Sequence, residues 1–362
     1  MYVRTSVREK FIPFFYRIYC VFREMAVYFR KKGMNGSQKG VSAMADTGKN
    51  SLPILLFECA ENSSGESAGL SCSWQICDNE KHSSRVCSGP FQGRTLHELL
   101  QQYGPALAGS GCTGKNFPLE VKTLCVRRTT PLQVRGTLQS CAAIAGAVPG
   151  TELWYILSAE KGAKIMAGIR QDSSRMRFME SLASGDAQSQ MQVFDSSAFD
   201  AYYIPGGRLH SIGEGNTILE IGSASASVFT LDNAASAPEE KAALQQALSC
   251  VDFMDRTVSR ITGASDVVSR NRKFPIVKFC PVFHAEELLL VTDWHDNTSP
   301  GSSFHLLSAA SGSFRVGKGE SGDFETVSEG GSCLVPASYG AYTILPLPGE
   351  SDQCRIIKTT LQ

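Results

Sequence analysis

The chain has 362 residues, of which 42% are hydrophobic and 19% charged, values typical of soluble globular proteins with room for two domains. Basic and acidic residues number 35 each, so no net charge draws the chain toward nucleic acid or an acidic partner. No basic aromatic platform is present either, and we predict no nucleic-acid partner.

The first 50 residues differ in composition from the rest. They begin basic and aromatic, and arginines interrupt each apolar run, so the run of about 20 apolar residues that a membrane span requires is missing. We predict no membrane span. We expect residues 1–50 to be a disordered extension and linker, or to precede a true start at Met25, Met34 or Met44. A basic amphipathic surface helix is the alternative.

Twelve cysteines are scattered along the chain, and no two of them form a C-x-x-C pair. A thiolate zinc knuckle is therefore not predicted. Several, such as Cys125 and Cys333, lie inside apolar strand-like runs. We expect them to be buried free thiols in a reducing compartment, which predicts a cytoplasmic protein.

The folded part is expected to begin at Leu52 and to be rich in short strands. Residues 71–78 alternate like a strand, and a helix is predicted between an N-cap at Thr95 and Gly104. Up to about residue 230, short apolar runs bounded by turn residues predict a sandwich or barrel rather than a parallel α/β sheet. These runs are residues 117–126, 130–134, 152–159, 163–169, 199–205, 208–213 and 218–224, with one helix from Arg175.

A second helix and a second β-rich half follow. Ser236 is the predicted N-cap, with Pro238 and two glutamates in the first turn. Strands are then expected at residues 274–283, 287–294, 303–309, 313–317, 332–337 and 341–347.

The two halves share a local phrase of strand, proline, small residues and strand, at residues 199–212 and 331–344. We therefore predict an all-β fold with a helical insertion that contains two related β-barrels, and the family resemblance given below implies that these are cupin-like jelly rolls. The predicted boundaries are a basic extension and linker at 1–50, an N-terminal barrel at 51–233, a helical connector at 234–265 and a C-terminal barrel at 266–362.

Several phrases, in this order, resemble the short bacterial class I mannose-6-phosphate isomerases over roughly residues 70–350. The most specific are TELWYIL, from Thr151, and YIPGGRLHSIGEG, from Tyr203. The resemblance implies two cupin-like barrels and a zinc-dependent isomerase that interconverts mannose 6-phosphate and fructose 6-phosphate. It implies a sugar phosphate as the partner and leaves the oligomeric state open.

The resemblance also assigns the site residues. Three of four zinc ligands are retained, as Gln133, Glu152 and His210, while Arg135 stands where the family has a histidine. Lys122 matches a family lysine and, with Glu152, is a candidate catalytic residue. Two substrate-side positions are substituted, because Gly150 and Thr230 stand where the family has lysine and arginine.

Two functions remain open at this point. The first is a working isomerase that uses Gln133, Glu152, His210 and Lys122 with zinc. The second is a catalytically impaired or re-purposed cupin that binds a sugar or regulates a partner, a possible pseudoenzyme. For the second, we predict that Arg135 pairs bidentately with Glu152 and that zinc affinity is weakened or lost.

Three histidines of the second half, His284, His295 and His305, fall in different predicted strands and loops. We expect them to be surface or packing residues rather than a second metal site.

Overall fold

The computed structural model divides the chain into two units, Met1–Gly48 and Lys49–Gln362. It describes residues 51–62, 69–79, 81–231, 237–298, 303–319, 322–347 and 353–362. The predictions for residues 1–50 and the predicted N-cap Ser236 lie outside these residues. No helix of the described part is long and apolar enough to cross a membrane.

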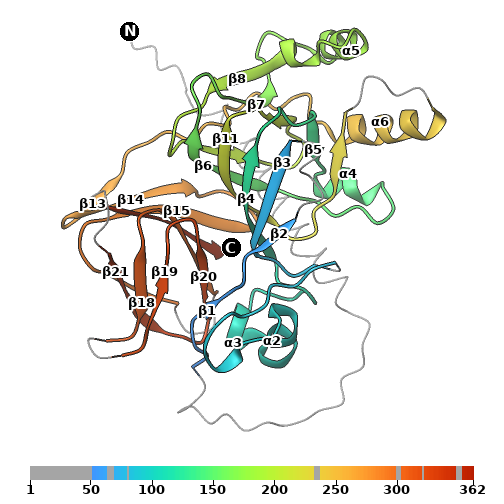
Figure 1. Ribbon diagram of the computed structural model, residues 1–362. Helices are drawn as coiled ribbons and strands as arrows, with labels where there is room; N and C mark the ends of the chain where they lie inside the picture. Colours follow the sequence, from blue (N-terminus) through green and yellow to red (C-terminus); the bar gives the residue numbers. More distant parts are fainter. Residues whose placement is uncertain are drawn as a thin grey trace, which may run out of the picture. The chain divides into compact units, whose positions relative to one another are not determined.

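Four antiparallel sheets make up the described part, and the all-β class with a helical insertion and two cupin-like barrels is confirmed. Most of the strands from β2 to β11, coloured blue to green, form one group, and those from β13 to β21, coloured orange to red, form a second (Figure 1). In the first group, one sheet contains, in spatial order, β2 (Ala60–Asn62), β3 (Leu70–Ile76), β4 (Leu119–Val126), β11 (Asn216–Ser223), β6 (Glu152–Ala159) and β9 (Ala201–Ile204). The other contains β12 (Val228–Thr230), β5 (Gln133–Arg135), β10 (His210–Ile212), β7 (Lys164–Ile169) and β8 (Met191–Asp195).

The second group also has two sheets. The larger contains β1 (Leu55–Leu56), β20 (Ser332–Val335), β17 (His305–Ser311), β22 (Cys354–Leu361), β15 (Phe283–Leu290), β14 (Asn271–Val277) and β13 (Asp266–Val268). The smaller contains β16 (Trp294–Asn297), β21 (Ala341–Pro346), β18 (Phe314–Gly317) and β19 (Phe324–Val327). Because β1 pairs with β20, the first strand of the described part joins the sheet of the C-terminal half. The predicted domain boundaries remain a prediction.

The two groups repeat the same topology, as the shared sequence phrase predicted. Strands β3 to β11 and β14 to β22 correspond one to one in chain order, and every neighbouring pair among β3 to β11 recurs among β14 to β22. For example, β4–β11–β6–β9 corresponds to β15–β22–β17–β20, and β5–β10–β7–β8 corresponds to β16–β21–β18–β19. The chain therefore contains two copies of one barrel arrangement.

The helices lie mainly at the edges of the strand groups (Figure 1). Helix α2 (Leu96–Tyr103) begins at Thr95, whose side chain forms a capping box with Glu98, and ends at Gly104, as predicted. Its buried leucines pack against the strands. The remaining helices are α3 (Pro105–Ala108), α4 (Leu138–Ala142), α5 (Arg175–Ala183) and α6 (Pro238–Cys250), with short 3-10 turns at Gly89–Phe91 and Ala187–Gln190.

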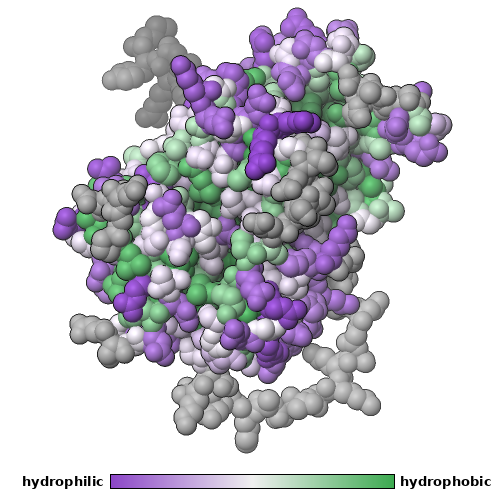
Figure 2. All heavy atoms as spheres, in the orientation of Figure 1, coloured by the Kyte–Doolittle hydropathy of each residue, from purple (hydrophilic) through white to green (hydrophobic). Residues whose placement is uncertain are grey.

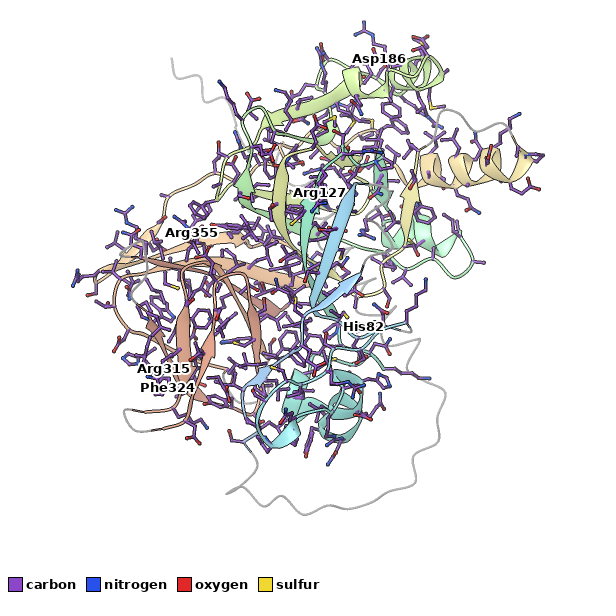
Figure 3. All side chains as sticks on the ribbon, in the orientation of Figure 1. His82, Arg127, Asp186, Arg315, Phe324 and Arg355 are labelled. Carbon is purple, nitrogen blue, oxygen red and sulfur yellow. The ribbon has the colours of Figure 1, made fainter. Side chains whose placement is uncertain are left out.

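Apolar side chains fill the space between the sheets of each group. Trp154, Ile165 and Ile212 belong to one buried cluster of the N-terminal half. Another cluster contains residues of both halves, including Phe117 and Phe304, whose ring centroids are 4.5 Å apart. Figure 2 shows a surface on which hydrophilic and hydrophobic residues are mixed. At the surface of the smaller C-terminal sheet, Arg315 stacks 4.9 Å from the ring of Phe324 (Figure 3).

Some predicted strands were wrong in extent. The run predicted at residues 274–283 splits into the end of β14 and the start of β15, because Pro281 lies in the intervening turn and cannot donate to a ladder. Strands β2, β8, β12, β13, β19 and β22 were not predicted at all, and β16 overlaps a predicted run only at Trp294. All cysteines in the described part are free, as expected, and Cys77, Cys141, Cys250, Cys280, Cys333 and Cys354 are buried. The expected burial is wrong for Cys125, which is half-buried, and for Cys59, which is exposed.

Candidate functional site

The fold brings the three predicted ligand residues together inside the N-terminal strand group. His210 on β10 lies directly opposite Gln133 on β5, so both side chains project from the same face of the sheet. Glu152, at the start of β6 in the facing sheet, places its Oε2 atom 4.0 Å from His210 Nε2. Glu152 and His210 are buried, and Gln133 is half-buried. The metal roles of these residues remain predictions.

Arg135 projects into the same space, because it lies two residues after Gln133 on β5. Its Nε and one terminal nitrogen both contact Glu152 Oε1. The other terminal nitrogen donates to the Ala226 carbonyl oxygen at 3.0 Å. The predicted pair with Glu152 is therefore present, although both nitrogens approach one oxygen, whereas a parallel bidentate pair would use both.

The second oxygen of Glu152 also has a protein donor, because Trp154 Nε1 donates to Oε2 at 3.1 Å. His210 Nδ1 donates to the Arg208 carbonyl oxygen at 2.8 Å, which leaves Nε2 as the acceptor facing Glu152. Burial lowers the pKa of His210, so its imidazole is neutral near pH 7.

Lys122 lies beside this group on β4, paired with Glu220 on β11. Its Nζ is 2.8 Å from Glu220 Oε1 and 3.7 Å from Glu120 Oε2, and it stands 4.6 Å over the Trp74 ring. Burial alone would lower the pKa of Lys122, but the two carboxylates raise it above its usual value. The lysine therefore carries a proton throughout the neutral range.

Glu220 was missed by the sequence analysis. Its Oε1 atom also lies 4.0 Å from Arg135, and it is buried. Burial would raise the pKa of Glu220, but Lys122 and Arg135 lower it, so the side chain is ionised. A lone glutamate in an otherwise apolar strand was the available signal, because a charge at such a position needs a buried partner.

The substituted positions border the same group. A Cβ atom at Gly150 would lie 2.4 Å from Ala226 Cβ and 3.1 Å from Arg135 Cδ, so a side chain there would overlap Ala226 and crowd Arg135. Thr230 is exposed at the end of β12, opposite Gln133 in the ladder. Both positions therefore lie at the site, where the resemblance placed them.

The donor set does not fit the zinc ion that the resemblance implies. Arg135 holds one oxygen of Glu152 and Trp154 holds the other, so a cation would have to displace a guanidinium and lose a hydrogen bond. In the part of the chain that the structure describes, no three His, Cys, Asp or Glu side chains are placed to hold a metal. The positive charge at this centre comes from Arg135 itself.

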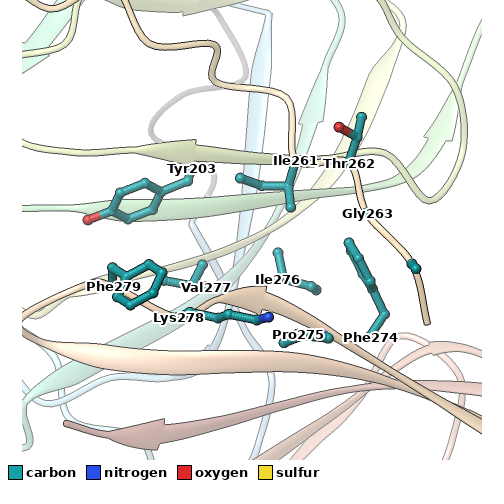
Figure 4. A pocket seen from close by; sticks show the side chains of 11 residues that line it. Tyr203, Ile261, Thr262, Gly263, Phe274, Pro275, Ile276, Val277, Lys278 and Phe279 are labelled. Carbon is teal, nitrogen blue, oxygen red and sulfur yellow. The ribbon is translucent and has the colours of Figure 1, made fainter. Parts of the chain in front are cut away.

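Two surface hollows lie elsewhere. One, of about 330 Å³, is lined mainly by apolar side chains that include Tyr203, Phe274 and the exposed Phe279 (Figure 4). The other, of about 460 Å³, adjoins Lys164 and Gln188. Neither is lined by any of the site residues above.

Comparison with known proteins agrees on one family, although no family model matches the chain. The mannose-6-phosphate isomerase of Streptococcus mutans is 30% identical over 147 residues, and ManA, the mannose-6-phosphate isomerase of Bacillus subtilis, is 27% identical over 148 residues. Each match spans 41% of this chain and 46% of the relative, so the chain matches about half the length of these curated relatives.

Solved structures show the same fold over more of the chain. A mannose 6-phosphate isomerase from Bacillus subtilis superposes with a TM-score of 0.70 at 19% identity, covering 86% of this chain and 99% of that one. A mutant phosphomannose isomerase from Salmonella typhimurium gives 0.66 at 13% identity, covering 85% and 99%. Matching sequence phrases, the repeated barrel topology and these likenesses together lead to one conclusion: the chain is similar to mannose-6-phosphate isomerases, in sequence over 41% of its length and in fold over 86%.

Proposed function

We propose that this chain acts in the sugar-phosphate chemistry of its family, with mannose 6-phosphate as the first candidate ligand. The proposal is supported by the names of the matched relatives and by the convergence of Gln133, Glu152 and His210 at one centre. Lys122 and Arg135 add positive charge at the same place, which suits an anionic ligand. The free cysteines fit a reducing compartment, so the proposed location is the cytoplasm.

The function that the geometry supports best is binding of such a sugar phosphate with little isomerisation, that is, a re-purposed member of the family. The observation that carries it is the buried contact between Arg135 and Glu152. A guanidinium in the place of a metal-ligand histidine repels a divalent cation and satisfies the carboxylate that would have held it. We therefore propose that zinc affinity is greatly weakened.

The chemistry of isomerisation explains why this matters. Moving a proton between C1 and C2 of an open-chain sugar passes through an enediolate, whose negative charge needs electrostatic stabilisation. Loss of one such stabiliser typically costs about a hundredfold to a thousandfold in rate. Gly150 and Thr230 remove two further charges that the resemblance assigns to the substrate side.

A working isomerase is the second candidate, and two observations favour it. His210 presents a neutral Nε2 acceptor to the centre, where it can take a proton, and the ammonium group of Lys122 adds positive charge beside it. In that case Arg135 would face the developing oxyanion in place of a metal.

Three measurements on the full chain separate these functions. Metal analysis after incubation with zinc is expected to show far less than one zinc per chain, whereas Arg135→His, which completes the set of four donors, is expected to gain zinc. Calorimetry with mannose 6-phosphate tests binding, and a coupled assay of mannose 6-phosphate and fructose 6-phosphate, with and without chelator, tests turnover.

The outcomes are distinct. Binding without turnover in either condition supports the re-purposed protein, and turnover that persists in chelator supports the metal-free isomerase. Stoichiometric zinc in the unaltered chain that is lost in Glu152→Ala would reject the proposed role of Arg135. No binding and no turnover, from protein with a cooperative melt, would reject both functions. Lys164→Met, which removes an exposed ion pair at the start of β7, is the matched control.

A further inference from the structure

The C-terminal strand group repeats the strands of the candidate site and also their register. In the N-terminal group Glu220 lies opposite Lys122, and two residues later Gly222 lies opposite Glu152. In the C-terminal group Lys358 lies opposite Glu286, and two residues later Thr360 lies opposite His305. The two ladders therefore superpose residue by residue.

The smaller sheets agree with this correspondence. His210 faces Gln133 on β10 and β5, and Tyr342 faces Asp296 on the corresponding strands β21 and β16. Five polar residues of the candidate site thus have polar counterparts in the second group. The counterparts of Lys122, Gln133, Glu152, His210 and Glu220 are Glu286, Asp296, His305, Tyr342 and Lys358.

These five side chains form two contacting groups, one around Lys358 and one of His305 with Tyr342, and Asp296 links the two groups through a hydrogen bond with Tyr342. Lys358 Nζ contacts Asp296 and lies 3.2 Å from Glu286 Oε1. His305 Nδ1 and the Tyr342 hydroxyl are 2.6 Å apart. A buried cluster of this kind is costly to keep in an apolar interior, so its recurrence at the equivalent place calls for a reason beyond packing.

The cluster is reachable from solvent and has no net charge. The side chains of Lys358, Asp296 and Glu286 are 10%, 16% and 18% exposed, while His305 and Tyr342 form the buried floor. Lys273 neutralises the second carboxylate, with Nζ 2.6 Å from Glu286 Oε2. Two carboxylates are therefore balanced by two ammonium groups.

We propose that the C-terminal barrel holds a second ligand centre, formed by Glu286, Asp296, His305, Tyr342 and Lys358, that binds a neutral polyhydroxyl compound of the monosaccharide class. Adjacent carboxylate acceptors and ammonium or phenol donors suit hydroxyl groups, which donate and accept at once. The half-buried Trp294, whose Nε1 is 3.4 Å from Asp296 Oδ2, adds an aromatic ring beside these groups. Balanced charge favours an uncharged ligand over a phosphate.

The test is calorimetric titration of the full chain with D-mannose, D-glucose and D-fructose, each without phosphate. Saturable binding of at least one is expected, and Asp296→Asn, which keeps the side-chain volume, should raise its Kd about tenfold by removing a charge-assisted hydrogen bond. Tyr342→Phe is a second volume-conserving variant with the same expected direction. Lys164→Met should bind as the unaltered chain does.

Two results would overturn the proposal. One is no saturable heat with any of the three sugars from protein that melts cooperatively. The other is binding that survives both Asp296→Asn and Tyr342→Phe but is lost in Gln133→Ala, which would place the sugar in the N-terminal barrel. Because the proposed function concerns a phosphorylated ligand at the N-terminal centre, failure here leaves that proposal intact.

Discussion

Replacing Arg135 by methionine is expected to destabilise the protein strongly, because it removes the cation while roughly keeping the side-chain volume. Glu152 is only 2% and Glu220 only 6% exposed, so neither carboxylate can regain full hydration in the folded state. Removing one partner of a buried ion pair typically costs about 3–5 kcal/mol. Lys122 still faces Glu220, which points to the lower half of this range.

The assay is urea unfolding near pH 7, monitored both by circular dichroism and by tryptophan fluorescence. Fluorescence reports on this site because Trp154 contacts Glu152 directly. Burial raises the pKa of a carboxylate that has lost its cation, so the folded variant binds a proton as the pH falls. The variant's deficit in free energy of unfolding should therefore be largest near pH 7 and shrink toward about pH 5. Lys164→Met, in an exposed pair, should cost at most about 1 kcal/mol.

A deficit below about 1 kcal/mol near pH 7, no larger than that expected of the exposed pair, would refute the reasoning. So would a deficit that stays constant between the two pH values, because the loss would then come from packing rather than from an unpaired charge. Coincident transitions by the two probes are required before the free energies are compared.

Three further changes test other parts of the structure. Gly150→Ala should lower the free energy of unfolding by about 1–3 kcal/mol, because its Cβ would overlap Ala226. Thermal melts measure this loss, and adding Ala226→Gly to the variant should recover most of it. Thr95→Ala removes the capping box of α2 and should cost about 0.5–2 kcal/mol in urea unfolding, and an unchanged midpoint would contradict the cap. Burial lowers the pKa of His305 to about 4, so the free energy of unfolding should fall as the pH drops from about 6.5 toward 4. His305→Gln should flatten this part of the curve of stability against pH, and an unaltered slope would contradict the assignment to His305.

The sequence by itself determined the fold class and most of the elements. Alternating apolar runs predicted the strands, because one face of each strand is buried. The N-cap at Thr95 and the helix-terminating Gly104 predicted both ends of α2 from the local sequence alone. The repeated phrase predicted two related barrels, and the matching phrases located Gln133, Glu152, His210 and the substituted Arg135.

Only the tertiary structure decided what Arg135 does and which charges surround it. Its contacts with Glu152 and Ala226, and the space it takes beside Gly150, join segments that are distant in sequence. Periodicity reports which face of a strand is buried but not which strand lies opposite, so the partners of Glu220 and the cluster around Lys358 could not be read from spacing. Those partners are fixed by strand order and register, which depend on packing across the whole barrel.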